Sequence, residues 1–469
     1  MFIRFFLMMV LLLFSTEFSK GETSDKTTKV SLTAIAQKAE EIASTYHDLG
    51  WFSGSLLLAK DGEVFYSQSF GYRDIETKAR NTVHTKFNLG SIMKNFTKVL
   101  VLQQVDSGKL SLTDTLDRFE LGFPAAIASK INLSHLLDHR SGFGDIFIAE
   151  YREDQLAYDS IQKKLQLLKD RPLLFEPGTD RKYSNYGYIV LGAVLEKITG
   201  RSFERLLSDQ IFDRIQLSNT SFRILNSSEH QSKRYTYLYD SSLKLVGATE
   251  HPSPDGGIES TVHDVQKFYH ELFFGSALLD RSNPIVKDAF GMSGEHWAAY
   301  GGGLGVSAAV EIDLTQDIEI VVLANTDKLV AEFISGRIKS FINTGTYKKI
   351  RPHEINFAYS FYKDKGKDQF YRDFKETYTE SGYSQFIGRV INELGMQLLK
   401  TKSWSEAFDV FNYLVFLFPS APQAYDSLAF AYFKKGDPET AYKTFTKALE
   451  LSPDFRSDYI SDNFGHSPQ

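Results

Sequence analysis

The chain of 469 residues contains no cysteine. This absence excludes disulfide bonds, a thiol nucleophile, thiolate metal ligands and an acylated cysteine anchor. The sequence also has no H-E-x-x-H motif, and His135, His139, His263 and His296 lack metal-ligand spacing. We interpret these histidines as structural or surface residues, and we expect neither a metal nor another cofactor.

Long apolar runs are also scarce. The run from Phe5 to Phe14 has about 10 residues, whereas a transmembrane helix needs about 20. One charge, Arg4, precedes it and a polar segment follows, which is typical of a secretory signal peptide. We expect a signal peptide over residues 1–21 and a periplasmic or secreted mature protein with no integral membrane segment. An N-terminal anchor or a buried helix are the alternatives for the same run.

No strong charge of either sign is present. The sequence has 53 basic and 59 acidic residues, and its net charge is −6. So mild a charge gives no indication of nucleic-acid binding. The 42% of hydrophobic residues is ordinary for a globular protein, and the length suits two or three domains.

The most informative motif that the sequence does contain is S-x-x-K, which Ser91 and Lys94 form. Apolar residues follow it at helical spacing, so both side chains lie on one face at the start of a helix. A serine hydroxyl needs a neighbouring base to act as a nucleophile, and the lysine is one turn away. Backbone N–H groups at the helix N-terminus favour an oxyanion. Taken alone, an N-cap serine and a solvated lysine are the simpler interpretation.

A second polar group, Tyr183-Ser184-Asn185, precedes an amphipathic helix expected from Ile189 to Gly200. Side chains two residues apart in an extended loop point the same way, so Tyr183 and Asn185 can face one cleft. A tyrosine near a lysine can relay protons, and an asparagine amide can hold a substrate. A core tyrosine and a turn asparagine are the simpler interpretation of this triplet alone.

Together these motifs resemble the penicillin-recognising serine hydrolases, which include class C β-lactamases, D-Ala-D-Ala carboxypeptidases and related esterases. The resemblance covers about residues 30–343 and is supported by residues 131–142, Pro177-Gly178 and residues 255–261. It implies an α+β fold in which helices flank an antiparallel sheet, with an all-helical subdomain. We expect this hydrolase domain over residues 28–345.

The third motif of the family is Lys-Thr-Gly or His-x-Gly on an inner strand, and its best match here is Tyr300-Gly301-Gly302-Gly303. Tyr300 stands where a cation is usual, so the likeness is weaker to β-lactamases and carboxypeptidases than to relatives acting on esters or other amides. By resemblance, Asn185, Tyr300, Gly301 and Gly302 bind substrate. The N–H groups of Ser91 and Gly303 form the oxyanion hole.

The resemblance implies an acyl-enzyme mechanism with Ser91, Lys94 and Tyr183 as catalytic residues. Lys94 and Tyr183 take the Ser91 proton, and which of the two is the base stays open. The sequence contains no G-x-S-x-G motif, so it does not indicate a nucleophile elbow. We expect a small-molecule or peptide substrate with an ester, amide or β-lactam-like bond. The alternative is an inactive domain that serves as a binding or scaffold protein.

The C-terminal part has a different composition. Residues 346–385 are rich in charged and aromatic residues and are predicted to form a helical linker with solvated faces. Small, aromatic and proline residues then recur at a spacing of about 34, which is typical of tetratricopeptide repeats. The matching positions are Leu394-Gly395, Ala407, Phe411 and Pro419, then Leu428-Ala429, Ala441, Phe445 and Pro453. We expect two repeats over residues 386–456 and a possible protein partner, although two unrelated hairpins could align by accident.

Overall fold

The structure is a computed structural model that describes residues 30–222, 230–247, 250–457 and 459. The expected signal peptide, residues 1–21, lies outside the described residues. Across the described ranges, no helix is both long and apolar enough to cross a membrane.

A five-stranded antiparallel sheet, in the order β2-β1-β11-β10-β9, forms the centre of the first domain. The strands are β1 (Gly54–Lys60), β2 (Glu63–Phe70), β9 (His296–Gly303), β10 (Val306–Asp313) and β11 (Ile318–Ala324). Asp61 and Gly62 both have positive φ, as a tight hairpin turn between β1 and β2 requires. The two ends of the domain meet where β1 pairs with β11, and β9 is left at one edge.

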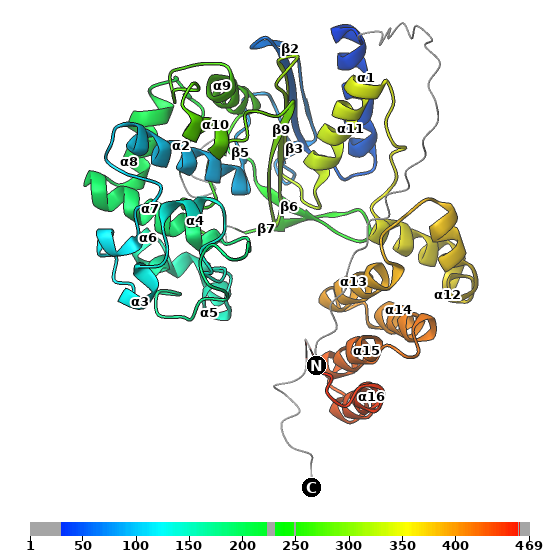
Figure 1. Ribbon diagram of the computed structural model, residues 1–469. Helices are drawn as coiled ribbons and strands as arrows, with labels where there is room; N and C mark the ends of the chain where they lie inside the picture. Colours follow the sequence, from blue (N-terminus) through cyan, green and yellow to red (C-terminus); the bar gives the residue numbers. More distant parts are fainter. Residues whose placement is uncertain (1–29, 223–229, 248–249, 458, 460–469) are drawn as a thin grey trace, which may run out of the picture.

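Helices cover both faces of this sheet (Figure 1). The α1 (Leu32–Asp48) and α11 (Val330–Thr344) helices pack on one face, and α9 (Val262–Phe273) packs on the other. Alternate residues of β10 separate the two cores: Ala309 packs with α1 and α11, whereas Ala308 and Val310 belong to the core that includes α2 (Met93–Asp106). Directly paired residues of two antiparallel strands point their side chains to the same face of the sheet. The face occupied by a β9 side chain is therefore given by its partner on β10.

A helical subdomain lies beyond α2, as the expected α+β fold requires. Its helices are α3 (Ala125–Ala128), α4 (Leu133–Leu137), α5 (Ala149–Glu153), α6 (Ile161–Leu165), α7 (Asn185–Thr199) and α8 (Phe203–Leu207), with α10 (Pro284–Ala289) nearer the sheet. Short ribbons pair β3 (Tyr72–Asp74) with β4 (Ala79–Arg80), β5 (Phe87–Asn88) with β8 (Glu259–Ser260), and β6 (Arg234–Tyr237) with β7 (Leu243–Val246). The expected fold class is confirmed.

The C-terminal module is a stack of helices, α12 (Glu354–Glu380), α13 (Ile387–Lys400), α14 (Trp404–Leu417), α15 (Pro422–Lys435) and α16 (Pro438–Leu451). The α12 segment breaks at Gly366, where φ is 77° and ψ is 169°, so it is itself a pair of helices. Phe370 and Phe374 are fully buried in the core shared with α13 and α14. The expected linker is thus helical but packed, because its aromatic residues form one apolar face.

The two parts of the chain touch through the β6–β7 ribbon. Tyr239, in the loop between these strands, belongs to the core of the C-terminal module and its hydroxyl lies 3.0 Å from the Thr401 Oγ1. The Asn356 amide donates to the Leu238 carbonyl at 2.7 Å. These contacts join α12 and the C-terminal end of α13 to the β6–β7 ribbon of the first domain.

Candidate active site

Ser91 lies in a single 3₁₀ turn, Gly90–Ile92, that leads directly into α2. Gly90 has a φ of 52°, a conformation that glycine adopts without strain, and its N–H donates to the Asn88 side chain at 2.8 Å. This turn places Ser91 at the N-terminal end of the helix, where backbone N–H groups favour a negative charge.

Three expected catalytic groups meet at the Ser91 hydroxyl. The Lys94 amine donates to Ser91 Oγ at 3.2 Å, and the Tyr183 hydroxyl donates to the same oxygen at 2.8 Å. Tyr183 is 45% exposed, so the site opens to solvent on that side. The structure therefore brings together residues that are far apart in sequence and gives them access to a substrate.

Lys94 is only 5% exposed, and its amine has two further acceptors. It donates to the Asn185 side-chain oxygen at 2.7 Å and to the Asp255 carbonyl at 2.6 Å. The Asn185 amide in turn donates to the Asp145 carboxylate at 3.1 Å. Three acceptors thus match the three N–H donors of an ammonium group. Asn185 therefore orients Lys94. Asp145 and the Asp255 carbonyl were not among the predicted site residues, although Asp255 opens the segment of residues 255–261 that supports the family resemblance.

His139 supports Tyr183 from behind. The two ring centroids are 4.4 Å apart, and the Ser184 N–H donates to His139 Nδ1 at 3.3 Å. Burial, followed by the charge of Lys94, lowers the pKa of His139 to about 4, so the ring is neutral at pH 7. The interpretation of His139 as structural agrees with this position, although its contact with Tyr183 was not foreseen.

The glycines of β9 lie against the Ser91 turn. A β-carbon on Gly301 would be 1.9 Å from the Leu89 carbonyl oxygen, and one on Gly90 would be 2.9 Å from the Gly302 nitrogen. Gly303 pairs with Val306 across a two-residue turn, which directs its amide into the ladder, so the amide of Gly302 faces the free edge. The geometry therefore favours Gly302 over Gly303 as the second oxyanion donor.

Tyr300 pairs with Ala309, so its side chain lies on the α11 face of the sheet rather than on the face of α2. Its hydroxyl donates to Glu311, whose other carboxylate oxygen accepts from Lys339 of α11 at 2.7 Å. Burial and the Glu311 carboxylate raise the pKa of Tyr300. The structure does not join this phenol to the Ser91 group, because side chains alternate along a strand.

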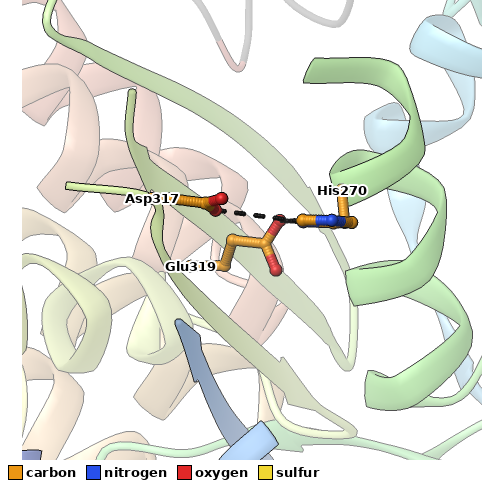
Figure 2. Close-up of side chains that lie close together, drawn as sticks. All are labelled: His270, Asp317 and Glu319. Carbon is orange, nitrogen blue, oxygen red and sulfur yellow. Dashed lines mark hydrogen bonds and ion pairs between the residues drawn. The ribbon is translucent and has the colours of Figure 1, made fainter. Parts of the chain in front are cut away.

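One group of metal-binding residue types lies elsewhere, at the end of the sheet opposite to Gly301 and Gly302. Figure 2 shows His270 of α9 beside Asp317 and Glu319 of the β11 region. His270 Nδ1 is 3.1 Å from one oxygen of the buried Glu319, and Gln266 donates to the other oxygen at 2.5 Å. These contacts form an ion-pair network between α9 and the sheet.

This network predicts a pH-dependent stability. The hydrogen bond to Glu319 raises the pKa of His270 above its ordinary value, so protonated His270 stabilises the fold at low pH and loses that contribution as pH rises through its folded pKa. We expect His270→Gln to lower the melting temperature by about 2–4 °C below pH 6 and by less at pH 9. A Lys267→Gln variant, at an exposed position of the same helix, is the control and should leave the melting temperature nearly unchanged at both pH values. A constant deficit for His270→Gln would contradict the ion pair.

Comparisons with known proteins agree with this geometry. Residues 40–339 match the Beta-lactamase family and residues 422–455 match the Tetratricopeptide repeat family. The chain is 30% identical to Penicillin-binding protein 4* of Bacillus subtilis over 258 residues, which are 50% of this chain and 56% of that protein. It therefore spans little more than half of this relative.

Solved structures share the fold. A penicillin-binding protein from Bacillus halodurans has a TM-score of 0.58 and 23% identity, and the match covers 64% of this chain and 98% of that one. The D-amino acid amidase from Ochrobactrum anthropi has a TM-score of 0.57 and 19% identity, with 66% and 99% covered. Since the family match spans most of the chain and surrounds the Ser91 group, the protein belongs to the β-lactamase family of serine hydrolases, with a tetratricopeptide repeat near its C-terminus.

Proposed function

We propose that this protein is a secreted or periplasmic serine acyl hydrolase that cleaves an ester or amide through an acyl-enzyme on Ser91. The observation that carries the proposal is the Ser91 oxygen, which lies 3.2 Å from the Lys94 amine and 2.8 Å from the Tyr183 hydroxyl. Acyl transfer requires a nucleophile, an adjacent proton acceptor and a second group that orients the nucleophile.

In the reacting form the Tyr183 side chain is a phenolate, and its oxygen accepts the proton of the Ser91 hydroxyl 2.8 Å away. The Lys94 amine is held by the Asn185 oxygen and the Asp255 carbonyl, so that it orients the Ser91 hydroxyl and lies 5.0 Å from the centre of the Tyr183 ring. Ser91 then attacks the carbonyl carbon, and the N–H groups of Ser91 and Gly302 hold the oxyanion. Tyr183 returns the proton to the leaving group, and a water molecule repeats the sequence to release the acyl group as an acid.

The walls of the site favour a substrate without a carboxylate beside the reacting bond. The β9 strand has neither lysine nor arginine, and Tyr300 points to the other face of the sheet. A β-lactam or a peptide C-terminus would lack a cation at this position. We therefore propose esters or neutral amides as substrates, and a protein partner for the repeats.

A fluorophosphonate probe tests the proposal directly. We expect the native protein to gain the mass of one phosphonyl group at Ser91, because the oxyanion hole stabilises the same tetrahedral geometry. The Ser91→Ala variant should fold with an unchanged circular dichroism spectrum and remain unlabelled. Absence of labelling in the native protein would favour the alternative of an inactive binding or scaffold domain, and equal labelling of both proteins would exclude Ser91 as the nucleophile.

A further inference from the structure

A cleft of about 440 Å³ lies between the hydrolase domain and the C-terminal module. Lys244 of the β6–β7 ribbon lines one wall, and Met396 and Lys400 of α13 line the other. Gly303 and Leu304, at the turn between β9 and β10, lie between the walls. Both parts of the chain thus contribute to one recess, which neither could form alone.

The cleft begins on β9 a short distance from the site around Ser91. Gly303 is two residues along the strand from Gly301, where a β-carbon would lie 3.2 Å from the Ser91 nitrogen, and two strand residues span about 7 Å. The leaving group must lie within reach of Tyr183, which donates its proton. Tyr183 is not among the residues that line the cleft, so the leaving group lies outside it, and the acyl group on the other side of the reacting carbonyl extends along β9 toward Leu304.

The charges of the cleft leave an excess of cations. Lys328 is bonded to Glu393 at 2.5 Å, so these two neutralise each other. The Asp327 carboxylate accepts from the backbone N–H groups of Tyr237 at 2.9 Å and Gly305 at 3.2 Å and is buried. Lys244 and Lys400 are exposed on opposite walls, and the structure gives their amines no acidic partner among the described residues.

An apolar path leads to these two lysines. Leu304 is 63% exposed at the tip of the β9–β10 turn, so it offers an apolar surface to a bound chain. Met396 lies on the facing helix, and a flexible thioether adapts to chains of different shape. An aliphatic segment followed by an anionic group matches this order of contacts.

We propose that the cleft binds the far end of the acyl chain and that the preferred substrates are esters or amides of an aliphatic acid that carries a second anionic group, such as a dicarboxylic acid. Lys244 and Lys400 bind this anion, and the first repeat helix is thereby a wall of the substrate site. The inference rests on the proposed function, because it takes the orientation of the acyl group from Ser91 and Tyr183.

Two esters with the same chain length test the proposal. We expect native protein to hydrolyse the mono-p-nitrophenyl ester of hexanedioic acid with a kcat/KM about tenfold above that of p-nitrophenyl hexanoate, mainly through a lower KM. Lys244→Glu and Lys400→Glu should each abolish this preference by raising the KM for the hexanedioic acid ester. Lys443→Glu, on the exposed face of α16, is the matched control and should keep the preference. A preference that is absent, or unchanged in both cleft variants, would overturn the proposal.

A binding measurement separates this inference from the proposed function. Octanedioate should raise the melting temperature of the Ser91→Ala variant, and it should fail to do so when Lys400→Glu is added. If the native protein does not hydrolyse p-nitrophenyl acetate, the proposed hydrolase function is refuted. The stabilisation of the Ser91→Ala variant by octanedioate would still test binding in the cleft. No stabilisation by octanedioate would overturn the cleft assignment even for an active enzyme.

Discussion

Replacing Tyr183 with phenylalanine is expected to lower kcat for a p-nitrophenyl ester by about 10³-fold and to leave the melting temperature unchanged. The substitution removes the oxygen that lies 2.8 Å from Ser91 Oγ and keeps the ring that packs 4.4 Å from His139. Because Tyr183 is 45% exposed, loss of its hydroxyl leaves no buried group without a partner. Stopped-flow hydrolysis and thermal unfolding on the same preparation measure the two effects.

Tyr188 is the matched control, since its ring also faces the Lys94 amine, at 5.7 Å. It is 3% exposed, and its hydroxyl donates to the Leu137 carbonyl at 3.1 Å. Tyr188→Phe should therefore reduce stability by about 1 kcal/mol and keep kcat within about threefold. If Tyr183→Phe retained more than a tenth of native kcat, Tyr183 could not be the principal base and Lys94 would take that role.

The catalytic group could be predicted because it depends on short-range rules. Ser91 and Lys94 share one face of a helix, and Tyr183 and Asn185 share one side of a loop, so each pair is readable from local spacing. The Asp255 carbonyl that accepts from Lys94 at 2.6 Å carries no sequence signal, since every residue has such a group. Asp145 likewise lies in a loop whose path depends on tertiary packing.

Strand register explains what the sequence could not settle on β9. A shift of one residue in the pairing of β9 with β10 moves every side chain of β9 to the other face of the sheet. It also exchanges the N–H groups that point toward β10 with those that point toward the free edge. The order of Tyr300 to Gly303 was clear, but whether Gly302 or Gly303 faced Ser91 depended on the Gly303–Val306 pairing. In the C-terminal module, the break at Gly366 turned an expected linker into a helical pair, because left-handed backbone at a glycine has no periodic signature.

Among substitutions near the oxyanion hole, we expect Gly301→Ala to disturb the two N–H donors most. A β-carbon there would lie 1.9 Å from the Leu89 oxygen and 2.9 Å from the Leu89 carbonyl carbon. Both are backbone atoms, which cannot rotate away as a side chain would. Gly301→Ala should therefore push β9 away from the Ser91 turn and separate the two oxyanion donors, with a loss of at least about 10²-fold in kcat.

Gly336→Ala is the control for this substitution, because a β-carbon at Gly336 in α11 would meet nothing within 4 Å among the described residues apart from the adjacent backbone of its own helix. It should leave kcat unchanged and raise stability slightly, since alanine favours a helix. Gly301→Ala should cost about 1–3 kcal/mol of stability through overpacking and still fold, so its activity can be measured below the unfolding transition. Fluorophosphonate labelling should slow in parallel with ester hydrolysis, because both reactions need the same two N–H groups. A folded Gly301→Ala enzyme with native rates would mean that β9 supplies no donor, and the oxyanion would then have to rest on the N-terminus of α2 alone.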